Sequence, residues 1–406
     1  MRDHGFRTAG FGQRLVLALI VLAGCTDHRA AITGTQSLQI DLVSPTNAGS
    51  IDNANRLPDT ERDVSMTITA MDADGNMDTT YNQKLQVYVY YLGTLSPYLG
   101  GSPLTTVQMV NGQGSMSATL PPVFGPTTLW FDDGSDSDPT YATGVSPTLW
   151  FRDPFVSDIQ TPNDEMAINA LTDSPLENKN VSVEITRYGT KGHLIITSRY
   201  SSGYTLADVQ CADTDPTKSC TPPCTSQNYD YIDVYSYSAP QDQDKRFLDE
   251  GQLVVGFAGG VSNFDGLIEI GFPQTFVNGL ADVHTECEPP AVVADFTGDA
   301  NDWFAHPINF KRNQAALIEI DNAKVCDLDD AFTTFNEWKL DPSGVGGICS
   351  GKNIIDIVTA GTVDIDPSTL VGKTLPKLVG TLRPIMESGF NVWLVYPRTL
   401  ADITTN

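Results

Sequence analysis

The chain has 406 residues, enough for two to four domains at about 100–200 residues each, and a hydrophobic content of 40% allows packed cores. It holds 50 acidic residues against 24 basic ones, which gives a net charge of −26. Binding to a phosphate backbone rests on lysine and arginine, and the sequence has no basic run, so the composition argues against nucleic acid as a partner.

The N-terminus has the layout of a secretory signal peptide. Arg2, Arg7 and Arg14 precede an apolar run at 15–22, and small residues follow it. A membrane-spanning helix needs roughly 20 apolar residues, so this run is too short to span a bilayer. Residues 1–24 are therefore expected to be a signal peptide.

The segment Leu22-Ala23-Gly24-Cys25 resembles the lipobox of bacterial lipoprotein precursors. The resemblance implies a diacylglyceryl group on the Cys25 thiol, cleavage before Cys25 and a membrane partner held through that lipid anchor. Because Thr26 rather than aspartate follows, it also implies an exported protein anchored in the cell envelope at the outer membrane. The alternative is an ordinary secretory signal with an accidental cysteine.

After a tether at 25–37, residues 38–151 have the pattern of an all-β domain. Apolar and polar residues alternate at 64–70, as in a half-buried strand, and Asn111-Gly112 predicts a hairpin turn between two further strands. Frequent turn signals between short strands favour an antiparallel sandwich. The stretch resembles a bacterial immunoglobulin-like domain, most clearly in the hairpin and in the segment that begins at Trp130.

Two further β regions follow a linker rich in proline and aspartate at 152–175. They cover 176–278 and 313–405 and are separated by a second linker at 279–312. The second region repeats the pattern of the first, since residues 372–382 mirror 251–261. We therefore expect an internal repeat of two related five-stranded barrels.

Both barrels resemble OB-fold modules of secreted bacterial proteins. The similarity lies in the turns at 249–251, 263–266 and 371–372, and in the tail with Trp393, Pro397-Arg398 and Asp402. Similar tails occur in OB modules that accompany extracellular nucleases. The fold class expected for the whole chain is all-β, an immunoglobulin-like sandwich followed by two OB-like β-barrels.

Seven cysteines divide into Cys25 and six others, an even number that predicts three disulfides in an exported chain. Their positions suggest a Cys326–Cys349 pair. The other four are expected to pair among themselves in an order that the sequence leaves open: Cys211, Cys220, Cys224 and Cys287. The alternative is a zinc site, because Cys220 and Cys224 have ligand-like spacing.

No catalytic pattern emerges from the sequence. It contains neither Gly-x-Ser-x-Gly nor His-Glu-x-x-His, and the histidines after the signal peptide are scattered. We therefore expect no catalytic residues, no bound cofactor and a protein that is not an enzyme.

Two candidate ligand sites remain. Asp72, Asp74, Asn76 and Asp78 space oxygen ligands at alternate positions, as calcium loops do, so a structural calcium is one interpretation and a solvated turn is the other.

The second candidate is a row of tyrosines at period two, which could share one face of a sheet: Tyr229, Tyr231, Tyr235 and Tyr237. OB barrels bind oligonucleotides or oligosaccharides on such faces, and the acidic charge favours a neutral glycan or a protein. The alternative is that the row packs inside the fold.

The sequence thus predicts a membrane-anchored lipoprotein of the cell envelope with a non-catalytic binding or structural role. A different class of function is a substrate-positioning accessory of a secreted nuclease or other polymer hydrolase. A third is an enzyme whose acidic catalytic residues are scattered along the chain.

Overall fold

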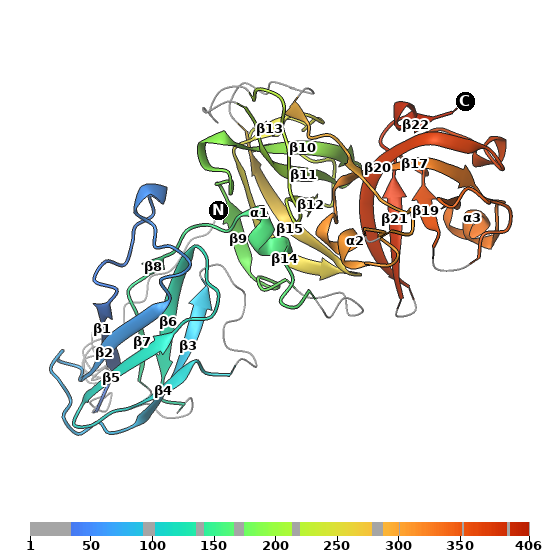
Figure 1. The fold of residues 1–406 in the computed structure, drawn as a ribbon. Coiled ribbons are helices and arrows are strands. Elements are labelled where there is room, and N and C mark those ends of the chain that lie inside the picture. Colours follow the sequence, from blue (N-terminus) through green and yellow to red (C-terminus); the bar gives the residue numbers. More distant parts are fainter. Residues whose placement is uncertain are drawn as a thin grey trace, which may run out of the picture.

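The computed structural model describes residues 34–91, 102–134, 142–165, 174–212, 220–277, 287–299, 301–350, 353–387 and 390–405. These residues form mainly β-strands, joined by loops and a few short helices (Figure 1). The blue and teal N-terminal unit lies at one end, and two further β units lie side by side at the other. No helix in these ranges is long and apolar enough to cross a membrane.

The N-terminal unit consists of two antiparallel sheets on one apolar core. Its strands are β1 (Ser37–Ser44), β2 (Asp63–Met71), β3 (Lys84–Tyr91), β4 (Thr105–Gln108), β5 (Gln113–Thr119), β6 (Pro126–Asp132), β7 (Thr143–Val145) and β8 (Leu149–Trp150). One sheet has the order β1-β2-β5, and the other has the order β4-β3-β6-β7 with β8 beside β6. In β2 alternate side chains from Val64 to Ala70 are buried, so the expected alternation at 64–70 is confirmed.

The predicted hairpin turn at Asn111 and Gly112 is present, since Val110 and Gln113 exchange backbone hydrogen bonds across it, but the pairing extends no further. Both turn residues have a left-handed backbone, with φ of 50° and 77°, as a tight turn requires. The flanking strands do not form a ladder with each other, because β4 pairs with β3 and β5 pairs with β2. The turn carries the chain between the two sheets, which lets Val107 and Met116 enter the same core from opposite sides.

The second unit is drawn in green to yellow in Figure 1. Its strands are β9 (Asn180–Val183), β10 (Gly192–Tyr200), β11 (Gly203–Gln210), β12 (Tyr231–Tyr235), β13 (Leu253–Val254), β14 (Gly256–Phe264) and β15 (Leu267–Phe276). The sheet runs β13-β10-β11-β12-β15-β14-β9. Only Val255 separates β13 from β14, so the pairing of β13 with β10 closes the sheet into a barrel, called here the first barrel.

The third unit, orange to red, is the second barrel. It contains β16 (Val292–Val293), β17 (Leu317–Val325), β18 (Glu337–Asp341), β19 (Ile355–Val358), β20 (Thr374–Glu387), β21 (Phe390–Tyr396) and β22 (Ile403–Thr404). β17 pairs with both β18 and β20, which closes a ring of five strands in the order β17-β18-β19-β21-β20.

The two barrels follow the same path through space. Counted from β10 and from β17, the first three strands of each ring are neighbours along the sheet. The last strand, β15 or β21, lies between the third strand and the fourth, which is β14 or β20. The pairs β12 with β15 and β19 with β21 are parallel, whereas the other ring pairings are antiparallel. The expected repeat is therefore visible as a shared strand order.

The helices are short, and only α1 and α2 lie in segments that join the units, whereas the others lie in loops within a unit. They are α1 (Val156–Gln160), α2 (Ile308–Arg312), α3 (Asp330–Phe335), and the 3-10 helices η1 (Asn53–Asn55), η2 (Gly189–Lys191), η4 (Pro367–Thr369) and η5 (Leu400–Asp402). Val156 and Ile159 of α1 are fully buried in the core of the first barrel. The helix therefore ties the segment 152–165 to that barrel.

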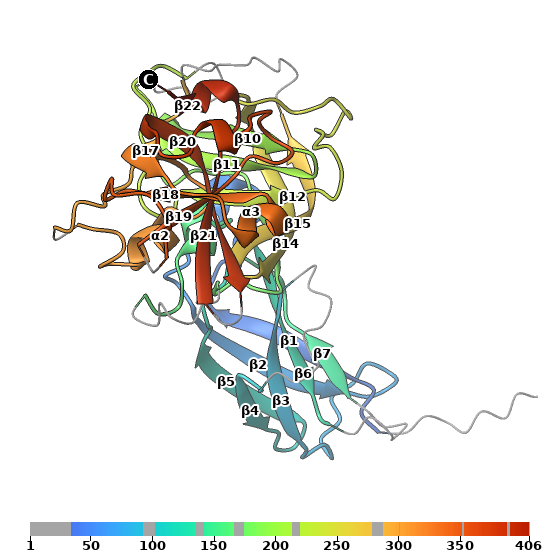
Figure 2. The same cartoon turned by 90° about the vertical axis from the view of Figure 1, so that its right-hand side faces the viewer.

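A single apolar core joins the two barrels, which overlap closely in the orthogonal view (Figure 2). Ile195, Ala207 and Tyr231 on the outer face of the first barrel are buried in the same cluster as the core of the second. Trp303 and Phe310, from the segment expected to be a linker, belong to this cluster too. The described part of that segment is packed, and the barrels form one body.

Candidate functional site

The outer face of the first barrel is arranged in rows, because residues in register on neighbouring strands lie side by side. One row is apolar and consists of Ile195, Ala207 and Tyr231 on β10, β11 and β12. All three are nearly inaccessible to water, since the second barrel covers them. This end of the face serves the contact between the barrels.

The next row is polar. Thr205, Asp233, Glu269 and Ser262 are in register across β11, β12, β15 and β14. Asp233 is fully buried and Glu269 is 6% exposed. Burial raises the pKa of both carboxyl groups, that of Glu269 to about 7, and the charge of Asp233 adds to the rise at Glu269.

Arg383 on β20 of the second barrel completes this row. Its Nε lies 3.5 Å from Asp233 Oδ2, and Tyr200 Oη donates a hydrogen bond of 2.5 Å to Asp233 Oδ1. The guanidinium carbon lies 4.9 Å from the ring centre of Tyr200 and 5.6 Å from that of Tyr396. Both the arginine and the tyrosine hydroxyl counteract the rise in the pKa of Asp233.

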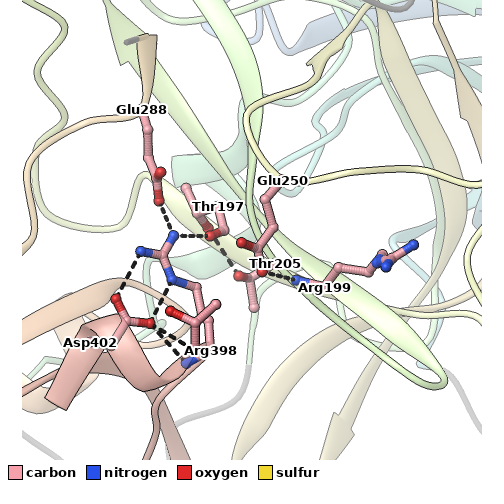
Figure 3. A network of polar contacts seen from close by, with 8 residues as sticks. Thr197, Arg199, Thr205, Glu250, Glu288, Arg398 and Asp402 are labelled. Carbon is pink, nitrogen blue, oxygen red and sulfur yellow. Dashed lines mark hydrogen bonds and ion pairs between the residues drawn. The ribbon is translucent and has the colours of Figure 1, made fainter. Parts of the chain in front are cut away.

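Arg398 makes a second polar link between the barrels (Figure 3). Its Nη1 donates to the carbonyl of Thr197 in β10 at 2.8 Å and forms an ion pair with Glu288. Nε and Nη2 each lie 3.2 Å from a carboxylate oxygen of Asp402. Asp402 also accepts from the backbone N–H groups of Arg398 and Thr399, and so caps η5.

This link gives the C-terminal motif a structural role. Burial raises the pKa of Glu288 and the charge of Arg398 lowers it, and the two effects together give a pKa of about 7. The Pro397-Arg398 and Asp402 signature therefore positions an arginine that fastens the second barrel to the first.

Beyond the polar row, aromatic side chains reach the surface. Tyr235, Tyr237 and Phe272 form a cluster that we call the aromatic strip. The rings of Tyr237 and Phe272 are stacked with centroids 4.7 Å apart, and Tyr235 meets Tyr237 edge-on at 4.4 Å. Phe272 is 79% exposed and Tyr237 is 57% exposed.

A β-bulge aims Phe272 outward. Gly271 opposes Gly260 and Gln274 opposes Ala258, so Phe272 and Pro273 together face Gly259 alone. Phe272 and Tyr237 both have a left-handed backbone, with φ of 52° and 59°. For a bulky side chain this conformation is strained, which indicates that the surrounding structure holds both rings in place.

Glycines lie beside the strip, and two of them, Gly203 and Gly271, are buried. Gly203, Gly271 and Gly260 are in register with Tyr235. A methyl group on Gly271 would have ordinary contacts only, the nearest at 3.8 Å from Ser262 Oγ.

The four predicted tyrosines do not form one exposed row. Tyr231 and Tyr235 share the outer face of β12, but Tyr231 is buried under the second barrel. Tyr229 precedes the strand with φ of 68°, is only 8% exposed, and bonds to Glu165 through its hydroxyl. The expectation of a shared face is thus corrected to the pair Tyr235 and Tyr237, with Phe272 as a partner that the sequence analysis missed.

The sequence around Phe272 gave only a weak indication that this residue lies in a β-bulge. Its neighbours Gly271 and Pro273 both interrupt a regular strand, which is typical of a bulge. The sequence analysis also missed Arg383. A single arginine within an apolar strand does not indicate that its side chain contacts the other barrel.

The six downstream cysteines form disulfides. Cys326 is bonded to Cys349, Cys211 to Cys224, and Cys220 to Cys287. Cys220 and Cys224, the candidate zinc ligands, have separate disulfide partners. Among the described histidine, cysteine and acidic residues, the sulfurs of Cys211, Cys220 and Cys224 are the only group of three or more ligand atoms that converge.

The acidic turn at Asp72 to Asp78 uses its carboxylates locally. Asp72 Oδ1 accepts from the backbone N–H groups of Asp74 and Asn76, each at 2.9 Å. Asp78 accepts from Thr80 and Thr35, and these bonds lower its pKa. The side chains do not gather around a common point, and structural calcium stays a prediction. Cys25 lies outside the described residues.

Comparison with models of known protein families gives no match, and neither does comparison with curated proteins. Among solved structures, the chain is similar to one described as the crystal structure of dimeric latent PorU from Porphyromonas gingivalis, with 10% sequence identity and a TM-score of 0.19. The match covers 89% of this chain and 34% of that chain, so this chain spans about a third of its length. A likeness at this TM-score carries no argument.

Proposed function

We propose that the chain is a non-catalytic binding protein of the cell envelope, held at the outer membrane by a lipid on Cys25. The lipobox and the signal peptide support the anchor, and the three disulfides support an oxidising location outside the cytoplasm. Under this proposal the N-terminal sheets are an immunoglobulin-like spacer and the barrels are OB-like modules. The common strand order of the barrels, with its parallel third and fifth strands, supports the second assignment.

The aromatic strip carries the proposal of a binding role. Two aromatic residues with a strained backbone, Tyr237 and Phe272, stack on each other and are largely exposed to water. An exposed stacked pair contributes about 0.5–1.5 kcal/mol to folding, whereas a left-handed backbone costs about 1–2 kcal/mol for each non-glycine residue. The two exposed rings therefore add little or nothing to the stability of the fold. A role in ligand binding would explain their presence directly.

We assign a neutral glycan as the ligand of the strip. Aromatic rings present flat apolar faces on which the C–H face of a sugar ring can lie. The net charge of −26 repels phosphate and other anionic polymers. Both carboxyl groups of the polar row are buried, and Asp233 is paired with Arg383, so they support the barrel contact instead of an acid–base reaction.

The alternative is an accessory that positions a polymeric substrate for a separate hydrolase. The same strip favours it, because a row of rings can hold a polymer chain without cleaving it. In this version the ligand is the substrate of another enzyme, and the chain alone gives no turnover.

Binding of the mature chain to an array of neutral oligosaccharides tests the proposal. Phe272→Gly should weaken binding by roughly tenfold or more, which corresponds to about 1.4 kcal/mol. The same variant should change the free energy of unfolding by less than about 1 kcal/mol, because glycine relieves the left-handed strain while the stacking is lost.

Phe264→Ser provides the control, since Phe264 is 63% exposed but lies outside the strip. Equal glycan binding by Phe272→Gly and the unchanged chain would overturn the assignment. Binding of a protein but of no glycan, lost in the same variant, would make the strip a protein-binding surface.

A further inference from the structure

The N-terminal unit and the first barrel are joined by a short connection at 152–155, which leads directly into α1. Units that share a single connection usually move relative to each other, unless a large apolar interface holds them. The sequence analysis predicted a linker here. In the structure, however, none of the residues from 151 to 160 is exposed to water, which calls for an account of what holds them.

The backbone of the connection is fixed at several points. The N–H of Arg152 donates to the carbonyl of Leu57 in the N-terminal unit at 2.8 Å. The ring of Pro154 fixes its own φ. The N–H of Phe155 donates to Asp158 Oδ2 in α1 at 2.8 Å. Few backbone torsions are therefore free to turn between the N-terminal unit and the helix buried in the first barrel.

The side chain of Arg152 binds both units at once. Its Nε lies 2.8 Å from Asp59 Oδ1 in the N-terminal unit, and its Nη1 lies 2.8 Å from Asp158 Oδ2 in α1. The guanidinium carbon lies 4.9 Å from the ring centre of Phe124 and 4.2 Å from that of Phe155. Because a guanidinium is planar and its donors are rigidly arranged, it holds both carboxylates in a fixed geometry.

Phe124 adds an apolar contact between the same two units. It lies in the loop between β5 and β6 of the N-terminal unit, yet its side chain packs against the core of the first barrel. The ring that Arg152 contacts from one side therefore also touches the barrel. Charge and apolar packing act at the same place.

A second ion pair fixes the start of the connection. Arg56 Nη1 lies 2.7 Å from Asp153 Oδ1, and it also donates to the carbonyl of Phe151 at 3.2 Å. The two charged side chains are only 9% and 4% exposed, so salt screens the pair weakly. The chain therefore leaves the N-terminal unit in a defined direction.

We propose that these contacts form a rigid joint, and that Arg152 is the residue that holds the N-terminal unit and the barrels in one orientation. The two parts keep separate apolar cores, but they move as one body. The aromatic strip then faces a fixed direction relative to the N-terminal end of the chain. The proposal does not depend on what the strip binds, because the joint and the strip share no residue.

A distance measurement between two spin labels tests the joint on the chain without its signal peptide. The labels are attached at Thr67→Cys in β2 and Ser201→Cys in the turn between β10 and β11, both exposed positions, and Cys25→Ser removes the other free thiol. Double electron–electron resonance should give one narrow distance peak. Adding Arg152→Ser should abolish the single peak and leave a broad distribution, because both ion pairs and the ring contacts are lost.

Arg62→Ser is the matched control and should keep the narrow peak, since Arg62 bonds to the carbonyl of Leu120 within the N-terminal unit. Asp59→Asn removes one carboxylate from the joint and should broaden the peak less than Arg152→Ser does. It decides the question if Arg152→Ser fails to fold. A narrow peak in both joint variants would overturn the role of Arg152, and a broad distribution in the labelled chain with an intact joint would overturn the rigid joint itself.

Discussion

At the scale of single residues, the most unusual groups are the carboxylates of Asp233 and Glu269. They are neighbours in register on β12 and β15, and both are buried where the barrels meet. A carboxylate out of water costs free energy, so burial raises both pKa values, and Arg383 offsets part of the rise. Stability must therefore depend on pH through these groups.

Glu269→Gln tests this dependence. An unfolded glutamate has a pKa of about 4.3, and the folded value is about 7, so between these limits the folded state binds more protons. The free energy of unfolding then falls as pH rises through this window. Between about pH 5 and about pH 8 the unchanged chain should lose about 1–3 kcal/mol more than the variant, as urea denaturation would measure.

The exposed Glu61→Gln is the matched control and should keep the slope of the unchanged chain. Equal slopes in Glu269→Gln and the unchanged chain would show that Glu269 is ionised throughout this range of pH.

At the scale of elements, β20 of the second barrel docks on β12 of the first through one arginine. Arg383 pairs with Asp233 and lies against the rings of Tyr200 and Tyr396. Buried ion pairs add little net stability, but loss of one partner leaves an uncompensated charge. The contact between these strands should therefore respond very differently to single and double substitutions.

Arg383→Met should lower the free energy of unfolding by about 3–5 kcal/mol, because Asp233 remains buried without its partner. Adding Asp233→Asn should recover most of this loss, since no charge then stays in the interface. Chemical denaturation of the two variants measures the difference. If the double variant is no more stable than Arg383→Met, the arginine acts by packing and not by charge.

An exposed ion pair serves as the control for the buried pair of Arg383 and Asp233. Arg199 and Asp249 lie 3.4 Å apart with side chains 44% and 58% exposed. Arg199→Met should cost less than about 1 kcal/mol, because water screens the pair.

The sequence was sufficient for the β class, because that class rests on local patterns such as the alternation from Val64 to Ala70. It could not show which side of a strand another unit would cover. Tyr231 and Tyr235 have the same position in the alternation, yet Tyr231 is buried at the junction and Tyr235 belongs to the aromatic strip. That difference arises from packing between residues far apart in the chain.

The bulge at Phe272 was beyond the sequence analysis for a related reason. Alternation assumes that each residue has one partner across the ladder, and a bulge inserts a residue that has none. Both Phe272 and Arg383 owe their roles to strand pairing and docking, which local composition does not encode.

At the scale of the whole molecule, the barrels share one apolar core and the N-terminal sheets have a core of their own. The junction joins the barrels through apolar residues, Arg383 and Arg398. Neither barrel can unfold without exposing the other's buried face to water.

Hydrogen exchange during mild denaturation should show this coupling. Protection in β11 of the first barrel and β17 of the second should be lost at the same denaturant concentration, whereas β2 of the N-terminal unit should follow its own transition. Mass spectrometry of the corresponding peptides measures all three. Loss of protection in β17 well before β11 would contradict the single unit.

The disulfides have a consequence for the order of events in biosynthesis. The Cys211–Cys224 and Cys220–Cys287 bonds interleave along the chain. A chain released N-terminus first exposes the thiols of Cys211 and Cys220 before either has its native partner. Oxidation in order of appearance would join these two, and only thiol exchange could then correct the bond. Maturation of this half of the protein therefore calls for a disulfide isomerase as well as an oxidant.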